Sequence, residues 1–234
     1  MIPLRDSNRS RSFPFITVLL IIINSYIYFR QFISSPLETE EFILNYAFVP
    51  TQLSIRLESL PILGYIYPPL LTSIFLHGGL FHVLFNMLYL WIFGDNIEDK
   101  LGHFRFVFFY LFAGIASNLI YFSTASNSPI PLVGASGAIA GVLGAYFITF
   151  PRAKITTLFF VFFFVFLRKI PALYFLLFWF FIQVINIVTS SGTEGSSVAW
   201  WAHIGGFGQV NGGVTTPHSS QNRTCGFPTS GSSH

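Results

Sequence analysis

Long uncharged apolar runs constrain this chain more than any other feature. Residues 12–29 carry no charged side chain and are long enough to cross a bilayer, which needs about 20 apolar residues. Similar runs predict spans two to six at residues 78–93, 106–122, 136–150, 170–188 and 198–210. Hydrophobic residues make up 53% of the chain and charged residues only 9%, which excludes a soluble enzyme, a disordered chain and a disulfide-bonded secreted domain. The sequence predicts an all-α polytopic membrane protein.

The distribution of positive charge predicts how the bundle is oriented. If the N-terminus is cytoplasmic, only Arg30 and Arg56 fall in outside segments, and most other cations fall inside. The inside set is Arg5, Arg9, Arg11, Lys100, Arg105, Arg152, Lys154, Arg168 and Lys169. The apolar run 155–167 has basic residues on both flanks, so we expect an interfacial or half-inserted segment there rather than a span. The basic start also resembles a signal peptide, but no small-residue cleavage site follows span one, which favours an uncleaved helix.

Three regions of different character divide the chain. Residues 1–11 form a basic N-terminus that we expect to be cytoplasmic, and residues 12–207 form the membrane domain. Residues 208–234 are rich in Gly, Ser, Thr and Asn, a composition typical of a disordered tail. The net charge of +3 is small and scattered, so no nucleic-acid partner is expected. The expected partner surface is the lipid bilayer, and the expected location is a multi-pass position in the cell membrane.

Strongly polar residues inside membrane spans are costly and therefore indicate function. Ser136 opens span four, and His203 lies in span six, which runs in the same direction; the two residues are therefore expected at similar depth. Histidine can take the proton that makes a serine hydroxyl nucleophilic. Gly134 permits a sharp turn before the serine, and Gly137 lets another helix approach closely. The start of a helix also suits a developing oxyanion.

Span two adds further polar groups. His82 and Asn86 are four residues apart and share one helix face, so their N–H groups could complete an oxyanion hole. His77 lies in the preceding loop, where we expect it to order that loop. Taken singly, each group also has a structural interpretation: a serine among glycines usually packs, and a membrane histidine is more often structural than catalytic. The combination favours catalysis.

Other membrane chemistries fit less well. A zinc protease requires H-E-x-x-H, but no glutamate lies between His77 and His82. No acid lies inside the six predicted spans, which argues against a carboxylate dyad or an ion pump. The hydrolase motif G-x-S-x-G is also not met, because Ala138 stands two residues after Ser136. No metal ligands and no cofactor are predicted.

The segments HGGLFHVLFN in span two, GASG at the start of span four and AHIGG in span six occur in this order. Together they resemble the rhomboid family of intramembrane serine proteases over about residues 13–207. The resemblance implies a six-helix bundle around a water-filled cavity, with Ser136 as nucleophile and His203 as general base. It also implies an oxyanion hole from His82, Asn86 and the Ser136 N–H, with transmembrane helices as substrates and no cofactor.

The sixth span departs from the family pattern. The family has a further glycine seven residues after the histidine, where this chain has Val210, and the sequence then becomes polar. We therefore expect a truncated sixth helix. Two main hypotheses remain: an intramembrane serine endopeptidase, or a catalytically impaired rhomboid-like protein that binds client transmembrane helices without cleaving them. A transporter is a third and weaker alternative.

Overall fold

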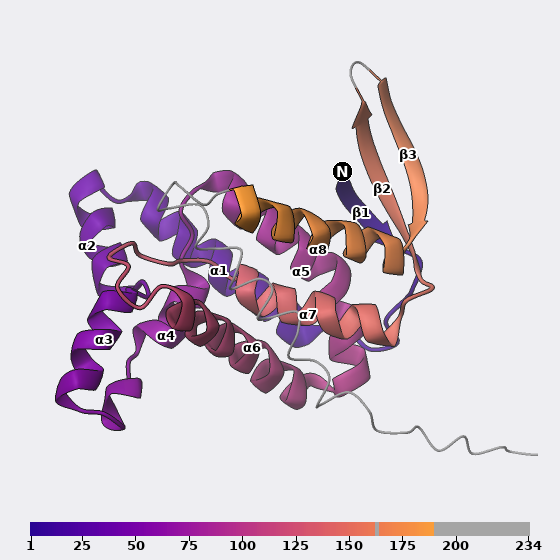
Figure 1. The fold of residues 1–234 in the computed structure, drawn as a ribbon. Helices are drawn as coiled ribbons and strands as arrows, with labels where there is room; N and C mark the ends of the chain where they lie inside the picture. The colour runs from indigo at the N-terminus through magenta and orange to yellow at the C-terminus, as the bar shows by residue number, and fades with distance from the viewer. Residues whose placement is uncertain (162–163, 190–234) are drawn as a thin grey trace, which may run out of the picture.

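A computed structural model describes residues 1–161 and 164–189 of the chain. Three of its helices are long and apolar enough to cross a membrane: α1 (Phe15–Ile33), α5 (Leu80–Leu101) and α6 (His103–Thr124). Two further apolar helices, α7 (Ser136–Thr149) and α8 (Ala172–Thr189), run beside them (Figure 1). Five of the six predicted spans therefore form helices. The sixth, at 198–210, lies outside the described residues, as does the tail 208–234, so a six-helix bundle stays a prediction.

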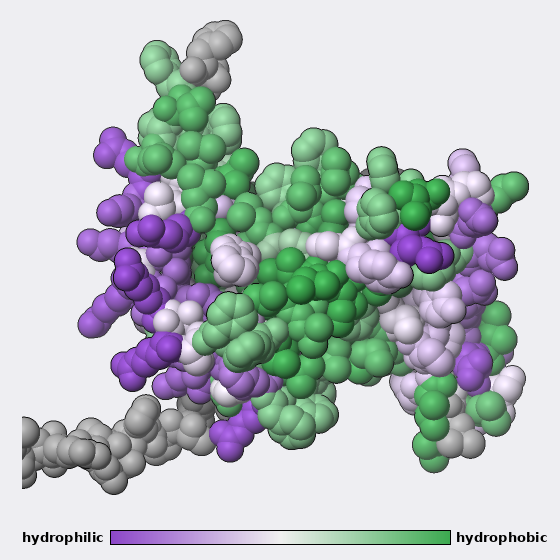
Figure 2. All heavy atoms as spheres, turned by 180° about the vertical axis from the view of Figure 1, so that it is seen from behind, coloured by the Kyte–Doolittle hydropathy of each residue, from purple (hydrophilic) through white to green (hydrophobic). Residues whose placement is uncertain are grey.

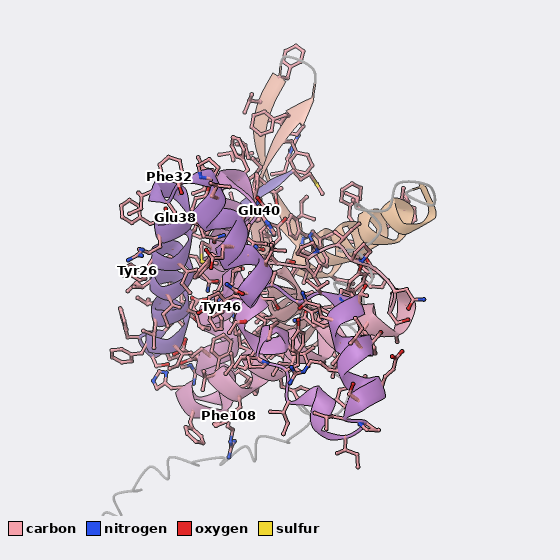
Figure 3. All side chains as sticks on the ribbon, turned by 90° about the vertical axis from the view of Figure 1, so that its left-hand side faces the viewer. Tyr26, Phe32, Glu38, Glu40, Tyr46 and Phe108 are labelled. Atoms are coloured by element: carbon pink, nitrogen blue, oxygen red, sulfur yellow. The ribbon has the colours of Figure 1, made fainter. Side chains whose placement is uncertain are left out.

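Helix α7 occupies the middle of the bundle. Every residue from Gly137 to Tyr146 is buried, among α5, α6 and α8. Its 14 residues extend about 21 Å, which is short of the roughly 30 Å hydrocarbon core of a bilayer. Because protein surrounds it, the length of α7 need not match the thickness of the lipid. By contrast, α1 lies at the edge of the bundle, where its Tyr26 and Phe32 are exposed (Figure 3).

The segment between α1 and α5 folds into short helices at one end of the bundle (Figure 1). These are α2 (Pro36–Tyr46), α3 (Pro50–Ser59), η1 (Leu63–Tyr65), α4 (Pro69–Thr72) and η2 (Ser73–Phe75). Ser35 and Glu38 form a capping box that starts α2. Phe48, Leu53 and Tyr67 form a small buried cluster with Tyr121 of α6. We call this end of the bundle, where α5 and α7 begin, the serine end.

A small sheet corrects the all-α prediction. It contains β1 (Ile2–Asp6), β2 (Lys154–Val161) and β3 (Phe164–Pro171), antiparallel and in that order. The run 155–167 therefore forms most of a hairpin, and part of the basic N-terminus is an edge strand. Aromatic and β-branched residues dominate this run, which is typical of strands, whereas hydropathy alone indicated only an apolar segment.

The opposite end of the bundle is polar and basic, and we call it the basic end. There α1 begins, α5 ends and α6 begins, and a band of hydrophilic residues covers it (Figure 2). Helix α5 continues to Leu101, eight residues beyond the predicted span, and Gly102 turns the chain into α6 at φ +81°. The predicted span 78–93 contains no acid, but the eight further residues of α5 contain Asp95, Glu98 and Asp99, and Glu98 is fully buried.

Candidate functional site

Ser136 is the first residue of α7, and no side chain caps this helix. The backbone N–H groups of a first helical turn have no intrahelical partner and carry the positive end of the helix dipole. Gly134 makes the preceding turn at φ +127°, a conformation that disfavours any other residue. Its N–H donates to the Ser73 carbonyl at 2.9 Å, which fixes the turn against η2.

Gly134 also brings Ser136 and His82 to one place. A Cβ at this glycine would lie 2.8 Å from both Cε1 and Nε2 of His82, and 3.6 Å from Oγ of Ser136. A Cβ at Gly78 would lie 3.9 Å from Nδ1 of the same ring. The half-buried imidazole therefore lies near two glycines, with the Ser136 hydroxyl close to one of them.

Asn86 lies one turn further along α5, on the same face as His82. Its side chain is buried, and within the described residues its amide nitrogen has no hydrogen-bond partner. A buried donor left without a partner costs about 1–3 kcal/mol. An open donor at this position is available to a bound group.

His77 is only 2% exposed and lies directly beside His82, with ring centroids 5.2 Å apart in an edge-to-face arrangement. Burial, and secondarily the neighbouring His82, lowers the pKa of His77 to about 3, so its ring is neutral at physiological pH. Neither ring nitrogen makes a hydrogen bond of good geometry within the described residues, although the Phe75 backbone lies close enough to oppose the lowering of the pKa. The backbone of His77 is held by Gln31 of α1, which accepts from its N–H at 3.3 Å and donates to its carbonyl at 3.4 Å.

Sequence reasoning did not identify the residues that support this site. Besides Gln31, Asn118 of α6 donates to the Leu70 carbonyl at 2.9 Å and to Ser73 Oγ at 3.0 Å. Ser73 in turn holds Gly134, so Asn118 supports the turn before Ser136. Both supporting residues are polar side chains on apolar helices, and that signal could have found them.

Gly137 contacts α6. A Cβ there would collide with the side chain of Ser117, so only glycine fits at this helix crossing. We expected the small residues of span four to allow the approach of span six; in the described residues, Gly137 serves the α6–α7 contact. His203 lies outside the described residues, so its distance from Ser136 stays a prediction. Within residues 1–161 and 164–189, no group of three His, Cys, Asp or Glu side chains could hold a metal ion.

Comparison with known proteins supports the resemblance. The chain is 40% identical over 93 residues to the mouse "Presenilin-associated rhomboid-like protein, mitochondrial", covering 39% of this chain and 25% of that protein. It is 49% identical over 76 residues to "Rhomboid protease GluP" of Bacillus subtilis (strain 168), covering 32% of this chain and 14% of that protein. The chain thus spans about a quarter or less of the length of these relatives.

These comparisons and the apolar helices establish an integral membrane protein of mostly helical fold. They do not support the plasma membrane as its location, because several relatives are named as mitochondrial. The profile of the Rhomboid domain matches residues 66–214, more than half of the chain, and this range includes every residue of the candidate site. The chain therefore belongs to the rhomboid family.

Proposed function

We propose that this protein is an intramembrane serine endopeptidase with Ser136 as nucleophile and His203 as general base. The observation that supports the proposal best is the meeting of the Ser136 hydroxyl and the His82 ring at Gly134, at an uncapped helix start inside a membrane bundle. Similarity to a relative named as a protease supports the same reaction class. The proposed catalytic domain is 12–207, and the tail 208–234 has no proposed catalytic role.

In the first step, His203 takes the proton of the Ser136 hydroxyl while Oγ attacks the carbonyl carbon of the scissile peptide bond. The carbonyl π electrons move to oxygen and form an oxyanion. His203 then gives its proton to the leaving amide nitrogen as the C–N bond breaks. The products of this step are a free amine and an ester between Ser136 and the remaining peptide.

The oxyanion accepts hydrogen bonds from donors that are oriented before it forms. These are the Ser136 N–H at the start of α7, the His82 ring and the open amide of Asn86. One such donor typically contributes 10²–10³ in kcat, because it is oriented before charge develops. His77 is a positioning residue: its buried ring contacts His82, and Gln31 holds its backbone.

In the second step, water hydrolyses the ester. His203 takes a proton from water, the resulting hydroxide attacks the ester carbonyl, and the proton returns to Ser136 Oγ as it leaves. Water must therefore reach the serine. Ser136 and His82 are half-buried rather than enclosed, and irregular backbone such as 125–135 is tolerated at membrane depth only beside protein or water.

The proposed substrates are transmembrane segments that enter the site from the bilayer. Residues that break a helix near the cleavage point would help such a segment present an extended peptide bond. By the positive-inside rule, the cations at the basic end favour a cytoplasmic N-terminus. The reaction requires no cofactor.

A fluorophosphonate probe tests the nucleophile. The full chain in detergent or nanodiscs should be labelled at Ser136, and both Ser136→Ala and His203→Ala should abolish the labelling. Ser123→Ala, at an exposed serine of α6, is the matched control and should label like the parent. Cleavage of a helix-destabilised single-span substrate should follow the same pattern. Labelling that survives Ser136→Ala, or substrate binding with no product, contradicts the proposal.

A further inference from the structure

The hairpin formed by β2 and β3 extends away from the helices (Figure 1). Its apolar residues are uncovered on the face that Figure 2 shows. Phe164 is 74% exposed, Val165 60%, and Phe160 and Leu167 57% each. A monomeric soluble surface rarely shows a contiguous apolar patch of this kind unless it binds something.

Both faces of the hairpin are apolar in its outer half. In the antiparallel register Leu158 pairs with Leu167 and Phe160 with Val165, which places these four side chains on one face. The other face carries the stacked pair Phe159 and Phe166, with ring centroids 5.4 Å apart. Rotating the hairpin therefore cannot hide its apolar surface from water. Only contact with lipid or with another protein surface can do so.

The direction of the hairpin is fixed at its root. The Lys154 N–H donates to Ser7 Oγ at 2.8 Å, the Ala172 N–H donates to the Ala153 carbonyl at 2.7 Å, and Ile155 is fully buried. From this root the strands extend away from the bundle, in a direction that crosses that of the helices (Figure 1). Because the helices cross the bilayer, the hairpin runs along the membrane surface at the basic end.

The charges of the hairpin are complementary to anionic lipid headgroups. The segment 152–171 contains no acidic residue, and its cations, Arg152, Lys154, Arg168 and Lys169, all lie near the root. The Arg168 guanidinium lies 5.9 Å from the centre of the Phe166 ring. Cations beside aromatic rings are the arrangement typical of residues at the boundary between lipid headgroups and acyl chains. Anionic headgroups complement this charge.

Backbone hydrogen bonding limits how deeply the hairpin can enter the bilayer. The register of β1 ends with Ile2 opposite Leu158, so the outer half of β2 has an open edge, and β3 is an edge strand throughout. Open edges do not occur in hydrocarbon because their N–H and C=O groups would have no partners. Water and headgroups supply those partners in the interfacial region, where aromatic side chains are also most favourable.

We propose that the outer halves of β2 and β3 lie in the interfacial region of the leaflet at the basic end, where Arg168 and Lys169 bind anionic lipid headgroups. This docking holds the end of α7 and the start of α8 at a fixed depth, because the hairpin connects them directly. It does not depend on the proposed peptidase reaction.

Site-directed spin labelling tests the depth, since Cys225 is the only cysteine of the chain. In a Cys225→Ser background, single labels at Phe160→Cys, Leu167→Cys and the control Lys100→Cys are placed in nanodiscs of phosphatidylcholine with phosphatidylglycerol. Lys100 is exposed at the basic end, outside the hairpin. The two hairpin labels should show an oxygen-to-nickel-chelate accessibility ratio several-fold above that of the control label. Their separate strands give two independent variants, and circular dichroism verifies the fold of each.

Either of two accessibility patterns overturns the proposal. Nickel accessibility at both hairpin positions equal to that at Lys100→Cys would place the hairpin in water. Protection from both reagents with dipolar broadening between labels would show that a second copy covers it.

Anionic lipid is tested separately. Arg168→Gln and Lys169→Gln should each lower the ratio of inserted to free hairpin about fivefold, since one such charge near an anionic surface contributes about 1 kcal/mol. Nanodiscs of pure phosphatidylcholine remove the headgroup interaction of both cations and should lower the ratio of the parent about 25-fold. An insertion ratio that neither the variants nor the neutral lipid alters overturns the headgroup assignment.

Discussion

The two ends of the bundle differ in which of their buried polar groups have hydrogen-bond partners. At the basic end the buried carboxylate has several: Glu98 accepts from the N–H groups of Ile16 and Thr17 at 2.8 and 2.7 Å, and contacts His103 Nδ1 at 2.6 Å, although the Thr17 hydroxyl has no partner among the described residues. Asn96 donates to Asp6, which also accepts from the Tyr146 hydroxyl at 2.6 Å. Burial raises the pKa of Asp6, although this last hydrogen bond opposes the shift.

At the serine end some buried polar groups stay open, beside others such as Asn118 that have protein partners. The ring of His77 and the amide of Asn86 make no hydrogen bond of good geometry among the described residues. Satisfied groups stabilise a fold, whereas open buried donors are retained at a cost in stability. The carboxylate of Glu98 therefore joins α1 to α5 at the basic end, whereas the amide of Asn86 at the serine end is available to bind another group.

The largest effect is expected from Glu98→Ala at the basic end. It removes the acceptor of two N–H groups at the start of α1, so the free energy of unfolding should fall by about 3 kcal/mol. Unfolding in mixed micelles measures this change, and Lys100→Ala, at an exposed neighbour, should be neutral. Equal stability of the two variants would show that Glu98 does not stabilise the contact between α1 and α5.

Asn86→Ala should instead affect the reaction. Loss of one oxyanion donor is expected to lower kcat about 10²-fold. The melting temperature should hardly change, because the amide has no partner in the described structure to lose. The matched control is Asn118→Ala, which removes two hydrogen bonds and should cost about 1–2 kcal/mol of stability. If Asn86→Ala melts earlier than Asn118→Ala, the Asn86 amide is a structural group and not an open donor.

Tyr146→Phe tests the link between β1 and the bundle. It removes the hydroxyl that donates to Asp6 and should lower the free energy of unfolding by about 1.5 kcal/mol. The exposed Tyr26→Phe should leave stability unchanged. Protease sensitivity of the N-terminal strand offers a second measurement, and a strand that is equally protected in both variants would contradict this prediction.

Acidification should slightly lower the free energy of unfolding, through the titration of His77 at the serine end. The pKa of His77 is about 3 in the folded protein and near 6.5 when unfolded, so its stabilisation is complete above pH 6.5 and is lost as the pH falls toward 3. Between about pH 7 and pH 5.5 the loss should be about 1 kcal/mol, measured by thermal melting. His77→Gln should flatten this dependence; an unchanged slope would mean that another group titrates.

Much of the helical framework could be predicted from hydropathy. Spans one to five fall on α1, α5, α6, α7 and α8, because an apolar run long enough for a bilayer has few other stable conformations. The sheet could not be predicted in this way, since β1 pairs with a strand about 150 residues later and only the tertiary fold brings them together. The proposed roles of Ser136, His82, Asn86 and His203 stay predictions.

The sequence by itself determined the membrane environment and the bias of positive charge, and it indicated the candidate reactive side chains, because these depend on residue type and spacing along the chain. Only the tertiary structure decided which polar groups are satisfied. Glu98 and Asn118 have protein partners, and Asn86 has none in the described residues, although all three are polar side chains on apolar helices. A hydrogen bond depends on distances of about 3 Å between segments remote in the chain, and those distances are set by packing.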